Sequence, residues 1–382
     1  MVAYTTEIPP PGFFIREELE ARGWSQRDLA GVLGVPEQAV NMIASGKRGV
    51  SADMAKKLGD AFDVSPEFFL NLQRAFDLSR APEADPGVSK RARFYTHYPI
   101  REMAKRGWIA SADEAEKIES EMMRFFEVKA PDKIPHMAHA AKKTSYEEIP
   151  PAQLAWLFRV RQMAREAVVG RYSRAAAGSA ITKLSALLGA PDEARHVPRI
   201  LAEAGIRYVL VESLPNAKID GVCFWLDEAS PVIGMSLRYD RIDNFWLVLR
   251  HELEHVIRGH GRDTHTPMMD SDIESGDQEA NEEERLANEA ARWFCVPQKE
   301  MASFIARKQP YFAEKDMIGF AGRLGLHPGL VAGQLRRQLG RWDLFVKHLV
   351  KIRSAVAPNA LVDGWGDVAP VTKRGASNEQ DT

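Results

Sequence analysis

The stretch Asp243–Gly261, DNFWLVLRHELEHVIRGHG, predicts a long helix that carries a metal-binding pattern. His251 and His255 are four residues apart, so on a helix they lie one turn apart on one face, where both imidazoles can reach one metal ion. We expect Glu252 to lie beside that metal and to act as a general base. The opposite side of the helix carries an apolar stripe that anchors it in a core: Leu249, Leu253 and Val256.

Downstream, the stretch EANEEERLANEAARWFCVP (279–297) predicts a second helix that supplies acidic side chains. A catalytic zinc site takes three protein ligands and keeps a fourth position open. Glu284 is our choice for the third ligand, and Asn288 lies on the same face, one turn along, as a supporting neighbour. Zn²⁺ is the expected metal, and Mn²⁺ or Fe²⁺ also suit this ligand set. Three competitors for the third position stay open: Glu283, His260 and His265.

The composition is that of an ordinary globular chain. Its 382 residues correspond to two or three folded units, and 45% apolar with 27% charged residues excludes disordered, collagen-like and disulfide-stapled classes. The net charge of −2 means that any basic DNA-binding face must be local. The two cysteines lie in apolar contexts, and no apolar run approaches the roughly 18–20 residues of a membrane span. We therefore expect a cytoplasmic protein with no membrane contact.

Residues 13–81 break into about five short amphipathic helices separated by cap and stop signals. In a helix-turn-helix the second helix of a pair enters the major groove, and here that helix is Pro36–Ala44. A bundle used only for protein contacts is the alternative. The side chains expected at base edges are Gln38, Asn41 and Ser45, and those expected at phosphates are Gln26, Arg27, Lys47 and Arg48. Because two-fold operators generally require a dimer, we expect a homodimer.

The chain between these regions reads as mostly helical over residues 91–189. The pair His136 and His139 in that segment has no carboxylate partner nearby, so we expect no metal there. Three β-type runs then predict a small sheet, at residues 206–212, 221–226 and 231–237. From residue 356 onward the apolar periodicity is low, which predicts a flexible tail.

Two resemblances add to these predictions. The segment from PPPGFFIREELEARGWSQRDLAGVLGVPEQAV to SPEFFLNLQ resembles the Xre-type helix-turn-helix of the HigA antitoxin family. GVCFWL, PVIGMSLRYDRIDNFWLVLRHELEHV and ERLANEAARWFCVP resemble the ImmA/IrrE metallopeptidase family, and alignment on Ala287, Asn288, Ala291 and Pro297 places Glu284 at that family's third-ligand position. Glu254 stands where the family carries a small residue.

Together these observations predict a mainly helical chain of the α+β class. A five-helix helix-turn-helix bundle precedes a mostly helical, zincin-like domain with a small sheet. The expected divisions are a DNA-binding domain at 1–82, a helical linker domain at 83–190, a metallopeptidase domain at 191–355 and a flexible tail at 356–382.

The functional hypothesis is a transcriptional regulator that binds operator DNA and carries a zinc metalloendopeptidase-like domain. That domain cleaves or senses a partner protein, such as a repressor, antitoxin or toxin. One alternative is a HigA-type antitoxin or autoregulator whose metal domain is a sensor or a structural module. Another is a peptidase whose N-terminal bundle recruits its target.

Overall fold

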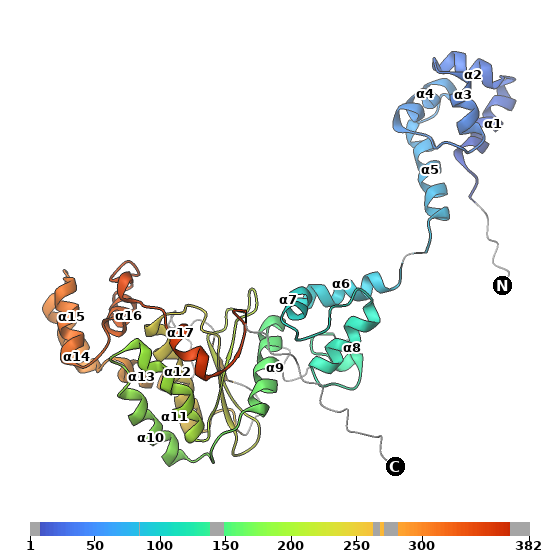
Figure 1. Cartoon of the computed structure of the whole chain (residues 1–382). Helices are drawn as coiled ribbons and strands as arrows, with labels where there is room; N and C mark the ends of the chain where they lie inside the picture. Colours follow the sequence, from blue (N-terminus) through green and yellow to red (C-terminus); the bar gives the residue numbers. More distant parts are fainter. Residues whose placement is uncertain (1–7, 84, 138–148, 263–267, 271–281, 367–382) are drawn as a thin grey trace, which may run out of the picture. The chain divides into compact units, whose positions relative to one another are not determined.

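The computed structural model describes residues 8–83, 85–137, 149–262, 268–270 and 282–366. The chain divides into two compact units, Met1–Asp85 and Pro86–Thr382, and each is described by itself (Figure 1). Among the described residues, no helix is both long enough and apolar enough to cross a bilayer. The observed structure confirms a mainly helical chain with a small mixed sheet and an N-terminal helical region.

The first unit is a bundle of short helices with well-defined ends. α2 begins after Ser25, whose side chain accepts a hydrogen bond from the N–H of Asp28 while the Asp28 carboxylate accepts from the N–H of Ser25. α2 ends at Gly34, which takes the left-handed conformation with φ of 61°. The helix bounds in this unit are α1 Pro11–Arg22, α2 Gln26–Leu33, α3 Glu37–Ala44, α4 Ala52–Phe62 and α5 Pro66–Arg80.

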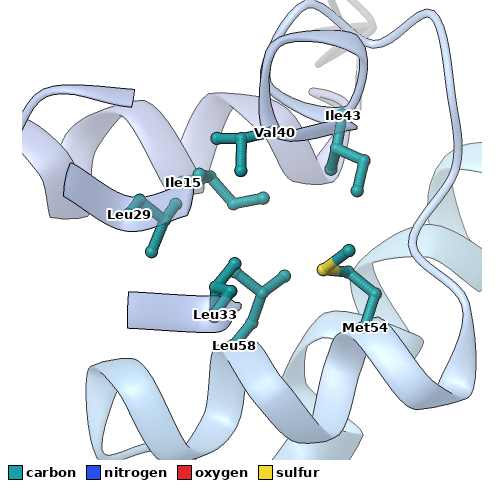
Figure 2. A pocket seen from close by; sticks show the side chains of 7 residues that line it. All are labelled: Ile15, Leu29, Leu33, Val40, Ile43, Met54 and Leu58. Atoms are coloured by element: carbon teal, nitrogen blue, oxygen red, sulfur yellow. The ribbon is translucent and has the colours of Figure 1, made fainter. Parts of the chain in front are cut away.

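The core of the first unit is formed by apolar side chains from α1 to α5, with Phe69 as the fully buried residue of α5. α2 packs against α3 and α4, and α1 packs against α3 and α5. Because the apolar residues recur at helical spacing, one face of each helix is buried and the other stays in solvent. Figure 2 shows seven of the side chains that meet in the centre: Ile15, Leu29, Leu33, Val40, Ile43, Met54 and Leu58.

The second unit is built on a mixed sheet with strand order β4-β2-β3-β1-β5 among the described residues. β1 (Arg207–Val211) pairs in parallel with β3 (Pro231–Met235) and with β5 (Leu361–Asp363). β2 (Gly221–Trp225) runs antiparallel to β3 and to β4 (Met268–Asp270). The three β-type runs seen in the sequence are thus β1, β2 and β3.

Helices cover both faces of this sheet (Figure 1). α9 (Pro151–Glu166) packs on one face and α12 (Ile242–Arg258) on the other. Successive strand residues point to opposite faces, so each strand contributes to two separate cores. The core with α9 contains Val209, Val211, Val222 and Val232, and the core with α12 contains Tyr208, Leu210, Cys223 and Ile233.

The other helices extend these two layers. The α9 side carries α6 Gly87–His97, α7 Ile100–Lys105, α8 Ala115–Phe125 and the 3₁₀ turn Pro131–Lys133. The remaining helices are α10 Arg174–Ser185, α11 Val197–Glu203, α13 Glu282–Cys295, α14 Gln298–Lys308, α15 Glu314–Arg323, α16 Pro328–Leu339 and α17 Arg353–Val356. Further 3₁₀ turns cover Pro191–His196, Val346–His348 and Ala357–Asn359. A split of this unit into separate domains at residues 190/191 stays a prediction.

The prediction of a flexible tail over residues 356–382 is wrong for its first part. Residues 361–363 form β5, which pairs with β1 at the edge of the sheet. Asp363 is fully buried and accepts hydrogen bonds from Arg159 and Trp108. Both partners lie some 200 or more residues earlier in the sequence, so the local apolar periodicity of the tail carries no sign of them.

Candidate metal centre and nucleic-acid interface

α12 is the central helix of the second unit, and it is buried on every side. All residues from Ile242 to Val256 are buried, between β2 and β3 on one side and α13, α16 and α10 on the other. The helix ends at Gly259, whose left-handed conformation, with φ of 76°, lets its N–H bond to the carbonyls of His255 and Val256. The expected anchoring stripe is buried, but the ligand face of the helix is buried too.

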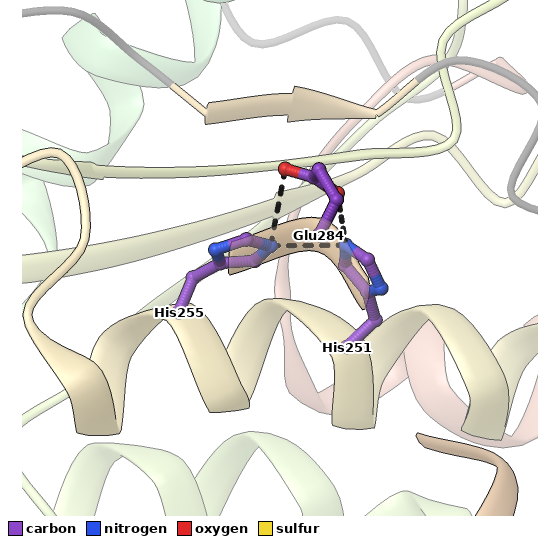
Figure 3. Close-up of side chains that lie close together, drawn as sticks. All are labelled: His251, His255 and Glu284. Carbon is purple, nitrogen blue, oxygen red and sulfur yellow. Dashed lines mark hydrogen bonds and ion pairs between the residues drawn. The ribbon is translucent and has the colours of Figure 1, made fainter. Parts of the chain in front are cut away.

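Three side chains predicted as metal ligands meet on this helix (Figure 3). His251 Nε2 and His255 Nε2 are 3.0 Å apart, and both rings are fully buried. Glu284 projects from α13 toward both rings, with its carboxylate oxygens 3.2 Å from His251 Nε2 and 3.6 Å from His255 Nε2. Two imidazole nitrogens and one carboxylate, with their ligand atoms within 4.8 Å of one another, make a donor set that fits Zn²⁺.

Small residues on α13 bring Glu284 within reach of α12. The buried residues of α13, which packs against α12, are all small: Ala287, Ala291 and Cys295, at spacings of four residues. Small side chains let two helix axes approach closely, because no long side chain separates the backbones. Glu284 lies one turn before Ala287 and is therefore carried to the ligand face of α12.

The charge of Glu284 is favoured by its partners. Burial by itself raises the pKa of this carboxyl, but the hydrogen bonds and charges of the His251 and His255 rings outweigh burial and hold the pKa of Glu284 well below its usual range. An ionised carboxylate is the form that ligates a metal.

Glu252 has its carboxylate packed against the backbone of β2. The side chain is fully buried, and a Cβ atom placed on Gly221 would lie 2.1 Å from Glu252 Oε1. Only glycine leaves room for the carboxylate at this point. Gly221 was not among the predicted site residues, although a glycine in a predicted strand can mark a close approach of another group to the backbone.

Glu254 lies within the His-Glu-Leu-Glu-His run but makes its contacts away from the histidines. Its carboxylate accepts hydrogen bonds from Arg250 at 2.7 Å and from Arg258 at 2.6 Å, one turn before and one turn after it. Burial raises the pKa of Glu254, and the two arginines lower it further than burial raises it, so the net pKa lies below its ordinary value. Glu254 is therefore an ionised helix-stabilising residue.

The competitors for the third ligand lie at the edge of the centre. His260 Nδ1 is 2.8 Å from Nδ1 of His255, on the side of that ring away from Glu284. Glu283 lies 3.7 Å from His260. Asn288 is half-buried, and its backbone carbonyl accepts a hydrogen bond from Arg292. His265 lies outside the described residues.

The histidine pair of the linker segment is only partly described. His136 forms a hydrogen bond between its Nε2 and the carbonyl of Ile149 at 2.8 Å, and its ring stacks on His97. His139 lies outside the described residues.

The seven side chains predicted to contact DNA lie on the surface of the first unit. Gln26 is half-buried, and the other six are exposed: Arg27, Gln38, Asn41, Ser45, Lys47 and Arg48. Asn41 on α3 donates a hydrogen bond to Gln26 on α2 at 3.1 Å, so the two helices are joined at this face. Lys47 and Arg48 follow α3, and their N–H groups both donate to the carbonyl of Met42.

Comparison with known proteins identifies the first unit. A helix-turn-helix family model matches residues 15–69. Virulence-associated protein A' of Dichelobacter nodosus is 45% identical over 76 residues, which are 20% of this chain and 66% of that relative. The HTH-type transcriptional regulator YddM of Escherichia coli K12 is 33% identical over 88 residues, which are 23% of this chain and 93% of that relative.

Among solved structures, the Pseudomonas aeruginosa antitoxin HigA with the higBA promoter is 37% identical, with a TM-score of 0.20. The match covers 21% of this chain and 97% of the antitoxin. The family model and the curated relatives agree on the same small module. Through this N-terminal module, the chain belongs to the helix-turn-helix family.

Proposed function

We propose that this protein is a cytosolic transcriptional regulator in which a helix-turn-helix domain is joined to a zinc metallopeptidase-like domain of the ImmA/IrrE type. The observation that carries the second half is the meeting of His251, His255 and Glu284 at one point in a buried core. Two histidines and a carboxylate from two separate helices are the ligand set of zinc hydrolases. A site that serves only structure has no need of a carboxylate base beside its ligands, and Glu252 supplies one.

The chain's own residues have distinct tasks in peptide hydrolysis. His251, His255 and Glu284 would hold the zinc, which would supply Lewis-acid chemistry for a peptide carbonyl and for water near neutral pH. Glu252 takes a proton from the attacking water and returns it to the leaving amine. Packing of its carboxylate against Gly221 fixes where that proton is held.

New amino termini provide the test of peptidase activity. The zinc-loaded full chain and its Glu252→Gln variant are incubated with soluble protein from the source cells, and newly formed termini are labelled and identified. We expect termini that only the wild type produces, since the variant keeps its zinc but loses the base. Identical sets of termini from wild type and variant would contradict peptidase activity. They would favour the alternative of an antitoxin or autoregulator whose metal domain is a sensor or a structural module.

The DNA-binding half is supported by its family and by its exposed polar face. The relatives include HTH-type transcriptional regulators and the antitoxin HigA with its promoter. We propose that Gln38, Asn41 and Ser45 read base edges and that Gln26, Arg27, Lys47 and Arg48 bind phosphates. Apolar side chains that α1 and α5 expose support a homodimer, with exposures of 40% at Phe13, 42% at Phe68 and 69% at Leu78.

Binding to the DNA upstream of the protein's own coding sequence tests this half. We expect the logarithm of affinity to fall with the logarithm of salt by about 0.9 per phosphate neutralised. Asn41→Ala should weaken binding to that DNA but not to unrelated DNA, whereas Lys47→Ala should weaken both. Equal affinity of wild type and Asn41→Ala for that DNA would contradict the assignment of α3 as the reading helix.

A further inference from the structure

We infer that His260 is a positioning residue for the metal centre, which holds the His255 ring in the tautomer and orientation that bind metal, and that Glu283 in turn orients His260. This inference rests on the proposed function, because it assumes that His255 is a ligand. It also gives two of the three competitors for the third-ligand position, His260 and Glu283, a different task.

The backbone fixes His260 in place. Its N–H donates to the carbonyl of His255 at 3.0 Å, and its own carbonyl accepts from the indole N–H of Trp225 on β2 at 3.1 Å. Gly259 and Gly261 on either side both have positive φ, at 76° and 71°, which makes a tight turn around the histidine. With only 12% of its side chain exposed, His260 is held by α12 and by the sheet at once.

The positions of the ring nitrogens decide where the protons lie. His255 Nε2 faces Glu284 and His251, so Nε2 is the atom that binds metal and the proton of the neutral ring is on Nδ1. That Nδ1–H donates to Nδ1 of His260, 2.8 Å away. Since Nδ1 of His260 accepts, its own proton is on Nε2, which faces Glu283 at 3.7 Å.

A hydrogen bond to the outer nitrogen of a ligating histidine fixes the tautomer and increases the basicity of the metal-binding nitrogen. Here the chain of partners runs from Glu283 through His260 to His255. Nδ1 of His260 is hydrogen-bonded to the His255 ring. This nitrogen is therefore not a metal ligand.

The test measures zinc affinity of the full chain by competition with a chelator. His260→Leu removes the acceptor, and His260→Asn keeps an oxygen where Nδ1 lies. We expect His260→Leu to weaken zinc binding by about 10–100-fold and His260→Asn to restore most of that loss. Glu283→Gln should cause a smaller loss. A matched control is His196→Leu, because His196 also lies 3.7 Å from a glutamate, Glu193, but far from α12 in sequence and partly exposed.

The outcomes separate this inference from the proposed function. Wild-type affinity in His260→Leu, or an equal loss in His260→Asn and His260→Leu, overturns the positioning role while the proposed function stands. Failure of the wild type to bind zinc overturns both. Loss of zinc binding in His260→Leu with recovery in His260→Asn supports the inference, since a merely structural defect is not repaired by a single acceptor atom.

Discussion

The Glu252 carboxylate packs directly against the backbone of Gly221. This contact predicts the effect of adding a single methyl group at residue 221. Gly221→Ala should lower the free energy of unfolding by about 1–3 kcal/mol, because an added methyl group overpacks the site. Its matched control is Gly178→Ala on α10, where a new Cβ meets nothing within 4 Å. The free energy of unfolding of Gly178→Ala should be about 0.5–1 kcal/mol higher than that of the wild type. Denaturant unfolding of both measures this contrast, and stabilisation by Gly221→Ala would contradict the packing described.

Glu254 gives a prediction in pH. Its folded-state pKa lies below the ordinary value of 4.5, so its stabilisation is complete above about pH 4.5 and is lost as the pH falls through the folded-state pKa. Glu254→Gln should lower the free energy of unfolding by about 1–3 kcal/mol at pH 7 and leave zinc content unchanged. Unfolding curves at a series of pH values should show that the difference in free energy of unfolding between wild type and variant becomes smaller below about pH 4.5. A difference that does not change with pH would contradict an ionised Glu254 held by Arg250 and Arg258.

Most residues of the candidate metal centre could be predicted from the sequence, because they follow from spacing along a helix. His251 and His255 could be chosen because helical spacing decides which side chains share a face. Spacing left Glu283 as a competitor of Glu284, and the family resemblance was needed to decide between them. Gly221 could not be connected with Glu252, since their contact depends on how a strand and a helix pack. The same holds for the contact of His260 with His255, which depends on the turn after α12.

At the scale of helices and strands, the approach of α13 to α12 decides whether Glu284 reaches the histidines. Ala291→Leu should push the two helices apart, lower the free energy of unfolding by about 1–3 kcal/mol and weaken zinc binding. The neighbouring Ala290 is only half-buried, so Ala290→Leu is the control and should change little. Thermal unfolding and zinc affinity measure both effects. Wild-type zinc affinity in Ala291→Leu would contradict this account of α13.

Helix and strand positions were predictable where local signals exist. Three of the first five helices, α2, α4 and α5, follow Ser25, Ser51 and Ser65, whose side chains accept hydrogen bonds from the N–H groups of the first turn. The other two, α1 and α3, begin next to a proline instead. β4 and β5 were missed because each has only three residues. Such short strands exist through pairing with β2 and β1, which lie far away in the sequence.

At the scale of the whole molecule, β5 joins the end of the described chain to residues that precede the sheet in sequence, through hydrogen bonds from Trp108 and Arg159 to Asp363. Asp363 and Arg159 form a buried ion pair, with 2.6 Å between Arg159 Nε and the carboxylate. Burial raises the pKa of Asp363, and Arg159 and Trp108 oppose that rise. Asp363→Ala leaves the arginine buried without its partner and should cost about 3–5 kcal/mol of unfolding free energy.

The control for this ion pair is Asp343→Ala. Asp343 pairs with Arg341 at 2.6 Å, but its side chain is 65% exposed. An exposed pair contributes about 0–1 kcal/mol, so the variant should unfold close to the wild type. Equal effects of the two substitutions in denaturant unfolding would mean that β5 does not anchor the fold.

The zinc content of the purified full chain, measured by elemental analysis, tests the central claim most directly. The comparison is between wild type, His251→Ala, Glu284→Ala and, as a control on the exposed side of α13, Glu289→Ala. We predict about one zinc per chain in wild type and Glu289→Ala, and loss of zinc in His251→Ala and Glu284→Ala. A folded wild-type chain that takes up no zinc when reconstituted, or a Glu284→Ala chain that keeps it, would contradict the metal centre on which the account depends.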